Sequence, residues 1–132
     1  MTLAAGLELP PTRERPRFDR TVGALVGSRC DACAATSWPA RAVCHRCGAA
    51  AMRVSAFRAD GTLLTYTKVW VARPGLEPPY TIGQVRLDGG PLVFGHVRGL
   101  GDGATVPATV RLVLADEETA VPPFWFEPEE AE

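Results

Sequence analysis

The four cysteines of this 132-residue chain are the residues whose type and spacing point most directly to chemistry. They form two CxxC pairs, Cys30 with Cys33 and Cys44 with Cys47, and ten residues separate the pairs. A CxxC turn directs both sulfurs to one point, so two such turns supply four thiolates in the tetrahedral arrangement that Zn²⁺ prefers. The spacing therefore predicts one structural zinc ion bound by the four cysteines.

The residues that follow the two cysteine pairs differ. Gly48 follows the second pair, and glycine readily adopts the positive φ that lets backbone amides face the ligand sulfurs. Ala34 occupies the matching position after the first pair, where a side chain disfavours that conformation. The first turn is therefore expected to be the less favourable of the two.

Disulfide bonds, a redox-active CxxC pair and bound iron are the alternatives to zinc. The sequence shows no signal peptide and no long apolar run, so we expect the chain in the cytoplasm, where structural disulfides are disfavoured. A catalytic redox pair would not require a second pair close by.

Four sulfurs complete the coordination shell, so His45 is expected to be an exposed neighbour of the site. A closed shell also leaves no position for substrate, which argues against zinc catalysis.

The rest of the sequence offers few residues for catalysis. It contains two histidines, His45 and His96, and no cysteine beyond the two pairs. It contains no GxSxG motif, no glycine-rich phosphate loop and no HExxH motif. His96 is expected on a strand in a structural role, and the acids beside glycines, Asp60, Asp88 and Asp102, are expected in turns. The chain is therefore predicted not to be an enzyme on its own.

The elements that position the cysteines are predicted to be mostly β-strands. An arm over residues 1–22, extended or with a short helix, is expected before a zinc ribbon over residues 23–51. Runs rich in β-branched and aromatic residues then predict strands at residues 52–58, 62–71, 81–87, 92–97 and 109–114. Five strands over about eighty residues can close into a barrel of the OB type, which leaves no exposed sheet edge. We therefore expect an OB-fold domain over residues 52–128 and an acidic tail over 129–132.

Alternation within the strands indicates which side chains form the core. Val110, Leu112 and Leu114 occupy alternate positions and are expected on one buried face. Tyr66 and Trp70 are four residues apart and therefore share a face of their strand, which we interpret as the core. A base-stacking platform is the less favoured alternative for these two rings, because it would need interleaved Lys and Arg residues.

Three consecutive aromatic residues, Phe124, Trp125 and Phe126, lie near the C-terminus. Their side chains cannot all point inward from an extended segment, so at least one is expected to contact another part of the barrel or a partner protein. Together with Phe18 and Trp38, they are the candidate partner-binding residues.

The net charge of −1 conceals an uneven distribution. Residues 1–58 contain nine arginines and four acids, whereas residues 59–132 contain five basic residues and eleven acids. An acidic second half disfavours a nucleic-acid-binding surface there. No apolar run reaches the ~18 residues that a membrane-spanning helix needs, so no membrane partner is expected.

The sequence resembles one family over about residues 18–128. The resemblance is carried by the two cysteine pairs and by short motifs, namely Trp38-Pro39, the Thr-rich segment 65–69, Pro79-Tyr80 and Phe126-Glu127-Pro128. These features are similar to the acyl-CoA-associated proteins known as domain of unknown function 35, which join a rubredoxin-like zinc ribbon to an OB-fold. Ala34 and the segment 106–108 depart from the family pattern, in which glycine is usual.

The resemblance implies an accessory subunit without an active site of its own. Such a subunit binds a thiolase-superfamily enzyme, which is a thiolase, an acyltransferase or a thiolase-like aldolase that shortens steroid side chains. It supports the carbon–carbon bond chemistry of that enzyme on acyl-CoA. A CoA thioester is then a ligand of the complex, and a hotdog-fold hydratase is a further partner.

Two other functions stay open from the residues. Zinc ribbons and OB-folds occur together in single-strand nucleic-acid-binding proteins, so this function is one alternative. A stand-alone acyl-CoA-binding protein or hydrolase is the other. The chain could equally be a whole subunit or a terminal domain of a longer protein.

Overall fold

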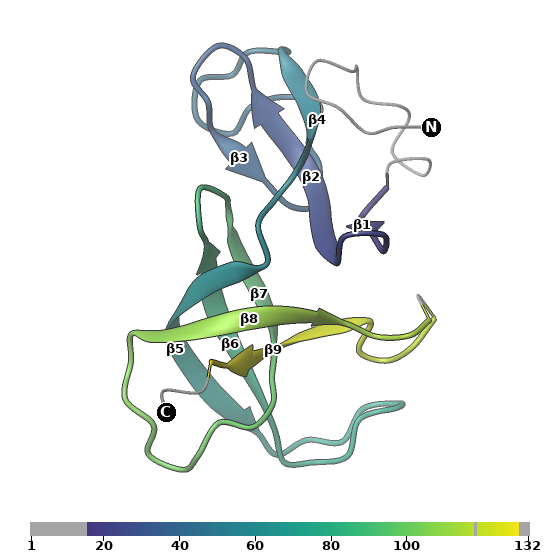
Figure 1. The fold of residues 1–132 in the computed structure, drawn as a ribbon, viewed down its shortest axis with the longest axis vertical. Helices are drawn as coiled ribbons and strands as arrows, with labels where there is room; N and C mark the ends of the chain where they lie inside the picture. Colours follow the sequence, from purple (N-terminus) through teal and green to yellow (C-terminus); the bar gives the residue numbers. More distant parts are fainter. Residues whose placement is uncertain (1–15, 118, 130–132) are drawn as a thin grey trace. The chain divides into compact units, whose positions relative to one another are not determined.

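The computed structural model describes residues 16–117 and 119–129, and all regular elements in these ranges are β-strands (Figure 1). Contacts divide the chain into two compact units. The first extends to Arg58 and includes Gly89–Pro91, and the second comprises Ala59–Asp88 and the chain from Leu92 onward. Most of the predicted arm at residues 1–22 and of the acidic tail at 129–132 lies outside the described residues. None of the described residues belongs to a helix long and apolar enough to cross a membrane.

The first unit is a small antiparallel sheet built around one central strand. This strand, β2 (Ala24–Cys30), pairs with β1 (Phe18–Asp19), β3 (Thr36–Ser37) and β4 (Met52–Ala56). All residues of β2 except Arg29 are buried. Within the predicted arm, for which an extended segment and a short helix were both expected, Phe18–Asp19 form a strand because they pair with β2.

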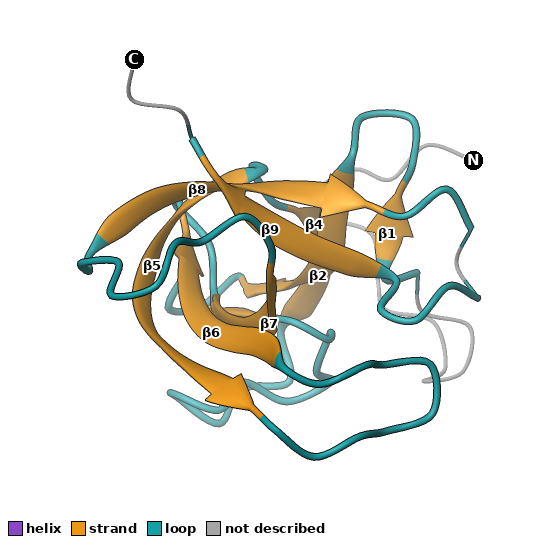
Figure 2. Cartoon of the chain, turned by 90° about the horizontal axis from the view of Figure 1, so that it is seen from below, coloured by secondary structure: helices purple, strands orange, loops and turns teal. Residues whose placement is uncertain are grey.

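The second unit is a closed five-stranded barrel with the strand order β5-β6-β7-β9-β8 (Figure 2). The strands are β5 (Asp60–Val69), β6 (Tyr80–Leu87), β7 (Leu92–Val97), β8 (Ala108–Leu114) and β9 (Phe124–Pro128). All neighbouring strands are antiparallel except β7 and β9, which are parallel. The prediction of an N-terminal zinc ribbon followed by a five-stranded OB-fold barrel is confirmed.

One strand was predicted in the wrong sheet. The strand expected at residues 52–58 is β4, which pairs with β2 in the ribbon sheet over Met52–Ala56. The fifth strand of the barrel is β9, which the sequence analysis had treated only as an aromatic segment. Pairing between segments distant in the sequence determines which strand belongs to the barrel, because β9 pairs with both β7 and β8 and so closes the sheet.

The barrel core consists of inward side chains from all five strands. Each strand contributes at least one almost fully buried side chain, and these include Leu63, Val85, Val93, Val110 and Phe126. Their exposed fractions are 2% or less. The predicted alternation of the last long strand is seen in β8, where Val110 and Leu112 are buried and Leu114 is half-buried near the strand's end.

A glycine in β7 makes room for the aromatic rings of β9. A Cβ atom on Gly95 would lie 2.9 Å from the ring of Phe126 and 3.0 Å from the ring of Phe124. The two rings meet edge to face, with centroids 6.0 Å apart and an interplanar angle of 87°. Two rings thus occupy the volume that a side chain at position 95 would take.

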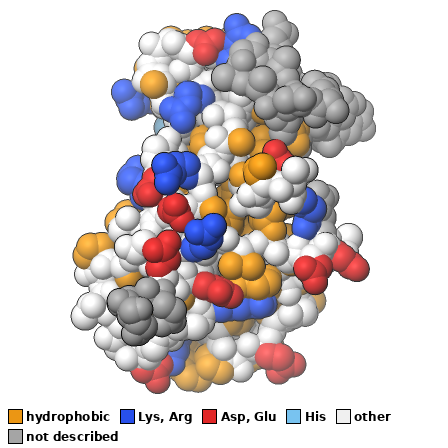
Figure 3. All heavy atoms as spheres, in the orientation of Figure 1, with side chains coloured by type: hydrophobic (Ala, Val, Ile, Leu, Met, Phe, Trp, Pro, Cys, Tyr) orange, Lys and Arg blue, Asp and Glu red, His pale blue; other side chains and the backbone are white. Residues whose placement is uncertain are grey.

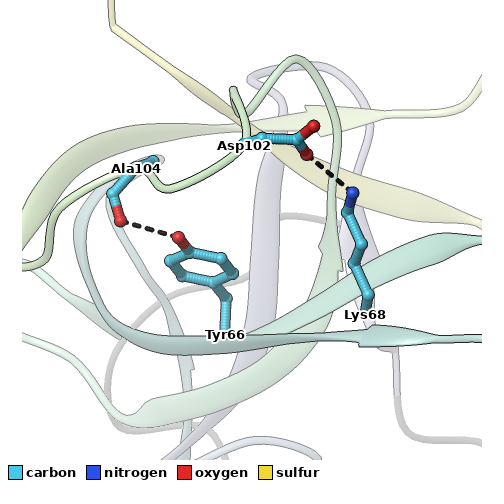
Figure 4. Close-up of polar contacts among 4 residues, drawn as sticks. All are labelled: Tyr66, Lys68, Asp102 and Ala104. Atoms are coloured by element: carbon cyan, nitrogen blue, oxygen red, sulfur yellow. Dashed lines mark hydrogen bonds and ion pairs between the residues drawn. The ribbon is translucent and has the colours of Figure 1, made fainter.

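The loop between β7 and β8 is bound to β5 by two side chains (Figure 4). The Tyr66 hydroxyl donates a hydrogen bond to the carbonyl oxygen of Ala104 at 2.6 Å, and the Lys68 ammonium pairs with Asp102 at 2.6 Å. The hydrogen bond from Lys68, together with its positive charge, lowers the pKa of the Asp102 carboxyl. Tyr66 is therefore half-buried against this loop.

The prediction that Trp70 belongs to the core is wrong. Its side chain is 69% exposed. The pairing of β5 with β6 ends at Val69 and Tyr80, so Trp70 lies beyond the last paired residue and no neighbouring strand covers it.

Candidate functional site

The first cysteine pair lies in a tight turn at the end of β2. Cys30 is the last residue of that strand and is buried, and Cys33 is half-buried. The Ala34 amide donates to the Cys30 carbonyl at 2.8 Å, and the Cys30 amide donates to the Ala35 carbonyl at 2.8 Å. Ala34 adopts a φ of 67°, which is unusual for a residue with a side chain.

The second cysteine pair has the same backbone arrangement. The Gly48 amide donates to the Cys44 carbonyl at 3.0 Å, and the Cys44 amide donates to the Ala49 carbonyl at 2.9 Å. Gly48 has a φ of 79°. The two turns are thus built alike, and the positive φ expected after each pair is present in both.

The four sulfurs converge on one point. The Sγ atoms of Cys30 and Cys47 are 3.7 Å apart, and those of Cys33 and Cys44 are 3.6 Å apart. All four sulfurs lie within 4.8 Å of one another. Ligands at the Zn–S distance of about 2.3 Å in a tetrahedron are separated by about 3.8 Å, so the arrangement fits one zinc ion.

The thiols of this cluster differ in acidity. Backbone amide hydrogen bonds from Cys47 and from Arg46, whose amide lies 3.4 Å from the Cys44 sulfur, are the main reasons that the pKa of Cys44 falls to about 6. The amide of Ala49 lowers the pKa of Cys47, but desolvation and the three neighbouring sulfurs raise it to about 11. Four thiolates so close together repel one another, and a divalent cation between them would remove that repulsion.

His45 is exposed beside the cluster, and the group of converging ligand atoms consists of the four cysteines. His96 lies on β7, where it is half-buried and stacks on Tyr80 with ring centroids 5.3 Å apart. The strand position predicted for His96 is therefore present.

The candidate partner-binding residues fall into two groups. Phe18 and Trp38 are half-buried in the ribbon, with ring centroids 6.1 Å apart. Phe124 and Phe126 point into the barrel, with exposed fractions of 7% and 0%, so their proposal as contact residues is corrected. Trp125 points the other way from β9 and is half-buried under Arg98, whose guanidinium carbon lies 3.8 Å from the ring centroid.

Sequence reasoning missed an exposed ring on β7. Phe94 is 69% exposed, although it belongs to a strand in which Val93 and Val97 are buried. The alternation of that strand is the signal that could have identified it, because Phe94 has the opposite parity to both valines.

Comparison with known proteins identifies both units. Residues 19–53 match the model of the ChsH2 rubredoxin-like zinc ribbon domain, and residues 55–115 match that of the ChsH2 C-terminal OB-fold domain. No curated protein matches the chain in a sequence comparison.

Two solved structures have a similar fold. A chain described as Ltp2-ChsH2(DUF35) aldolase superposes with a TM-score of 0.65 at 23% identity, covering 86% of this chain and 98% of the other. A DUF35 protein of unknown function from Sulfolobus solfataricus has a TM-score of 0.57 at 18% identity, covering 80% of this chain and 76% of the other. With both domain models matched in sequence and the ribbon and barrel present in that order, the chain belongs to the ChsH2 (DUF35) family of zinc-ribbon and OB-fold proteins.

Proposed function

We propose that this chain is a non-catalytic accessory subunit of a thiolase-superfamily enzyme. The observation that carries the proposal is the match of both domains to ChsH2 models, together with the likeness to a chain of the Ltp2-ChsH2 aldolase. That chain is covered over 98% of its length, so the likeness extends to the whole of the solved relative. A thiolase-like aldolase is the partner that these observations favour.

The cysteine cluster supports the non-catalytic part of the proposal. Thiolase chemistry needs a nucleophilic cysteine, and all four cysteines of the chain converge on one another. Zinc held by Cys30, Cys33, Cys44 and Cys47 would stabilise the ribbon and leave no coordination position for substrate. The reacting residues then belong to the partner enzyme, and this chain contributes to the assembly of the complex.

The finer parts of the proposal concern the ligands and partners of the complex. The substrate is a CoA thioester whose carbon–carbon bond the partner enzyme makes or breaks, and a hotdog-fold hydratase is a further partner in the cytoplasm. Phe18, Trp38 and Trp125 remain candidate contact residues, because each is half-buried and none points into the barrel core.

Co-expression with thiolase-like enzymes encoded near this chain tests the proposal. We expect a stable complex by size-exclusion chromatography with light scattering, and an enzyme that loses most of its activity or solubility when this chain is omitted. The purified chain alone should show no thiolase, hydratase or esterase turnover. A chain that stays monomeric with every such enzyme, while the enzymes are fully active without it, would contradict the proposal.

A further inference from the structure

The outer face of β5, β6 and β7 carries rows of side chains that are not charged at neutral pH. Strand pairing aligns outward residues across the three strands, and inward residues such as Val85 and Val93 alternate with them. The aligned rows are Thr65, Gln84 and Phe94; Thr67, Ile82 and His96; and Val69 with Tyr80. Burial, and then the charge of Arg98, lower the pKa of His96, which keeps its ring neutral. This outer face therefore combines uncharged polar side chains with the apolar Phe94, Ile82 and Val69.

Several side chains on and beside this face are strongly exposed. Phe94 is 69% exposed, and Val71, which follows β5 and lines the hollow described below, is 71% exposed. Leu92, the first residue of β7, is 38% exposed. Large exposed apolar side chains that gather on one face are typical of interaction surfaces in proteins.

The face is hollowed where two loops of the barrel approach it. A cavity of about 650 Å³ is lined by Val69, Val71, Ile82 and other side chains, and a second of about 370 Å³ adjoins it. Leu76 from the β5–β6 loop and Val121 from the β8–β9 loop line both cavities, as do Tyr80 and His96. OB-folds commonly bind ligands between these two loops and across the second and third strands, which are β6 and β7 here.

Charged side chains border the face without entering its rows. Arg73, Glu77 and Arg98 lie around the hollow, and Arg86 pairs across the strands with Leu92 at the other end. The border is therefore more positive than negative. Figure 3 shows a different surface on the side of the barrel that β8 crosses, where acidic and basic side chains are intermixed.

We propose that the uncharged face of β5, β6 and β7 is the surface on which the thiolase-like enzyme docks. The docking segment of that enzyme presents apolar side chains to the hollow and carboxylates to the arginine border, because such a surface is complementary in both respects. This inference rests on the proposed function. A single-stranded nucleic acid is the disfavoured occupant, since the rows contain aliphatic side chains and no Lys or Arg between their rings.

Phe94→Asp and Val71→Asp test the docking surface. Both positions are about two-thirds exposed or more, so each variant should retain wild-type zinc content and thermal unfolding. Each places a carboxylate within the apolar contact, and we expect each to weaken binding to the co-expressed enzyme by about tenfold or more, measured by calorimetry. Val22→Asp, at a ribbon position that is 68% exposed, is the matched control and should bind as the wild type does.

The outcomes separate this inference from the proposed function. If the wild type binds the enzyme and both barrel variants bind it equally well, the proposed location of the docking surface is wrong, whereas the accessory role is still supported. An equal loss in Val22→Asp would also contradict the assignment to this face. If the wild type binds no thiolase-like enzyme, the proposed function fails first. If the chain instead binds an oligonucleotide in a salt-sensitive way, and Phe94→Asp abolishes that binding, the occupant of this face is a nucleic acid and not the enzyme.

Discussion

At the scale of single residues, the two cysteine turns share their backbone hydrogen bonds but place different residues in the left-handed backbone conformation. Ala34 has a φ of 67° and Gly48 a φ of 79°, and the hydrogen bonds around them match. A side chain in this region costs roughly 1–2 kcal/mol, whereas glycine adopts it freely. The first turn therefore stores strain that the second does not.

We expect Ala34→Gly to raise the free energy of unfolding of the zinc-bound ribbon by about 1 kcal/mol, because it removes this strain. Gly48→Ala is the mirror-image control and should lower it by about as much. No atom lies within 4 Å of a Cβ placed on Gly48, so the effect there comes from the backbone conformation alone. Thermal unfolding of the two variants measures both changes, and a less stable Ala34→Gly protein would disprove the strain argument.

At the scale of elements, the barrel depends on how β9 enters between β7 and β8. Phe126 is the largest fully buried side chain of the chain's described part, and Gly95 on β7 leaves the space for its ring. β9 is therefore positioned by the packing of its two aromatic rings against Gly95, in addition to its hydrogen bonds to both neighbouring strands.

Gly95→Val should destabilise the barrel by about 1–3 kcal/mol, because the added atoms overlap the rings of Phe124 and Phe126. Gly101→Val is the control. A Cβ at Gly101 meets no atom within 4 Å, so this variant should stay within about 0.5 kcal/mol of the wild type. Urea denaturation followed by tryptophan fluorescence provides the comparison, and equal midpoints for the two variants would show that the ring packing is not tight.

At the scale of the whole molecule, the chain divides into two compact units. The cysteine cluster packs with Ala35 and Met52 in the ribbon, whereas the barrel is built around Phe126 and the branched residues of β5–β8. Structural zinc contributes on the order of 10 kcal/mol to the folding of small modules. We therefore expect the ribbon to depend on the metal and the barrel to fold without it.

Purified protein should contain about one zinc ion per chain, as expected for one four-cysteine site. Chelation of the metal, or Cys44→Ser, should unfold the ribbon and leave the barrel intact. Amide hydrogen exchange would then show lost protection in β2 and β4 and retained protection in β6 and β7. Loss of protection throughout the chain would show that the units fold as one, and metal-free protein with two disulfides would disprove the zinc site.

The sequence by itself determined the parts of this protein that depend on neighbouring residues. The CxxC spacing placed four sulfurs within reach of one ion, and alternation along β8 identified Val110 and Leu112 as buried. Four of the five barrel strands follow from the same local pattern of branched residues and turns.

The tertiary structure alone decided which strands pair and which faces they leave open. Residues 52–56 and 124–128 both have strand-like sequences, but only long-range hydrogen bonding assigns the first to the ribbon and the second to the barrel. Trp70 and Phe94 are exposed for the same reason, since burial depends on whether a distant segment covers a side chain. Local propensity carries no information on such contacts, which are set by the packing of the whole domain.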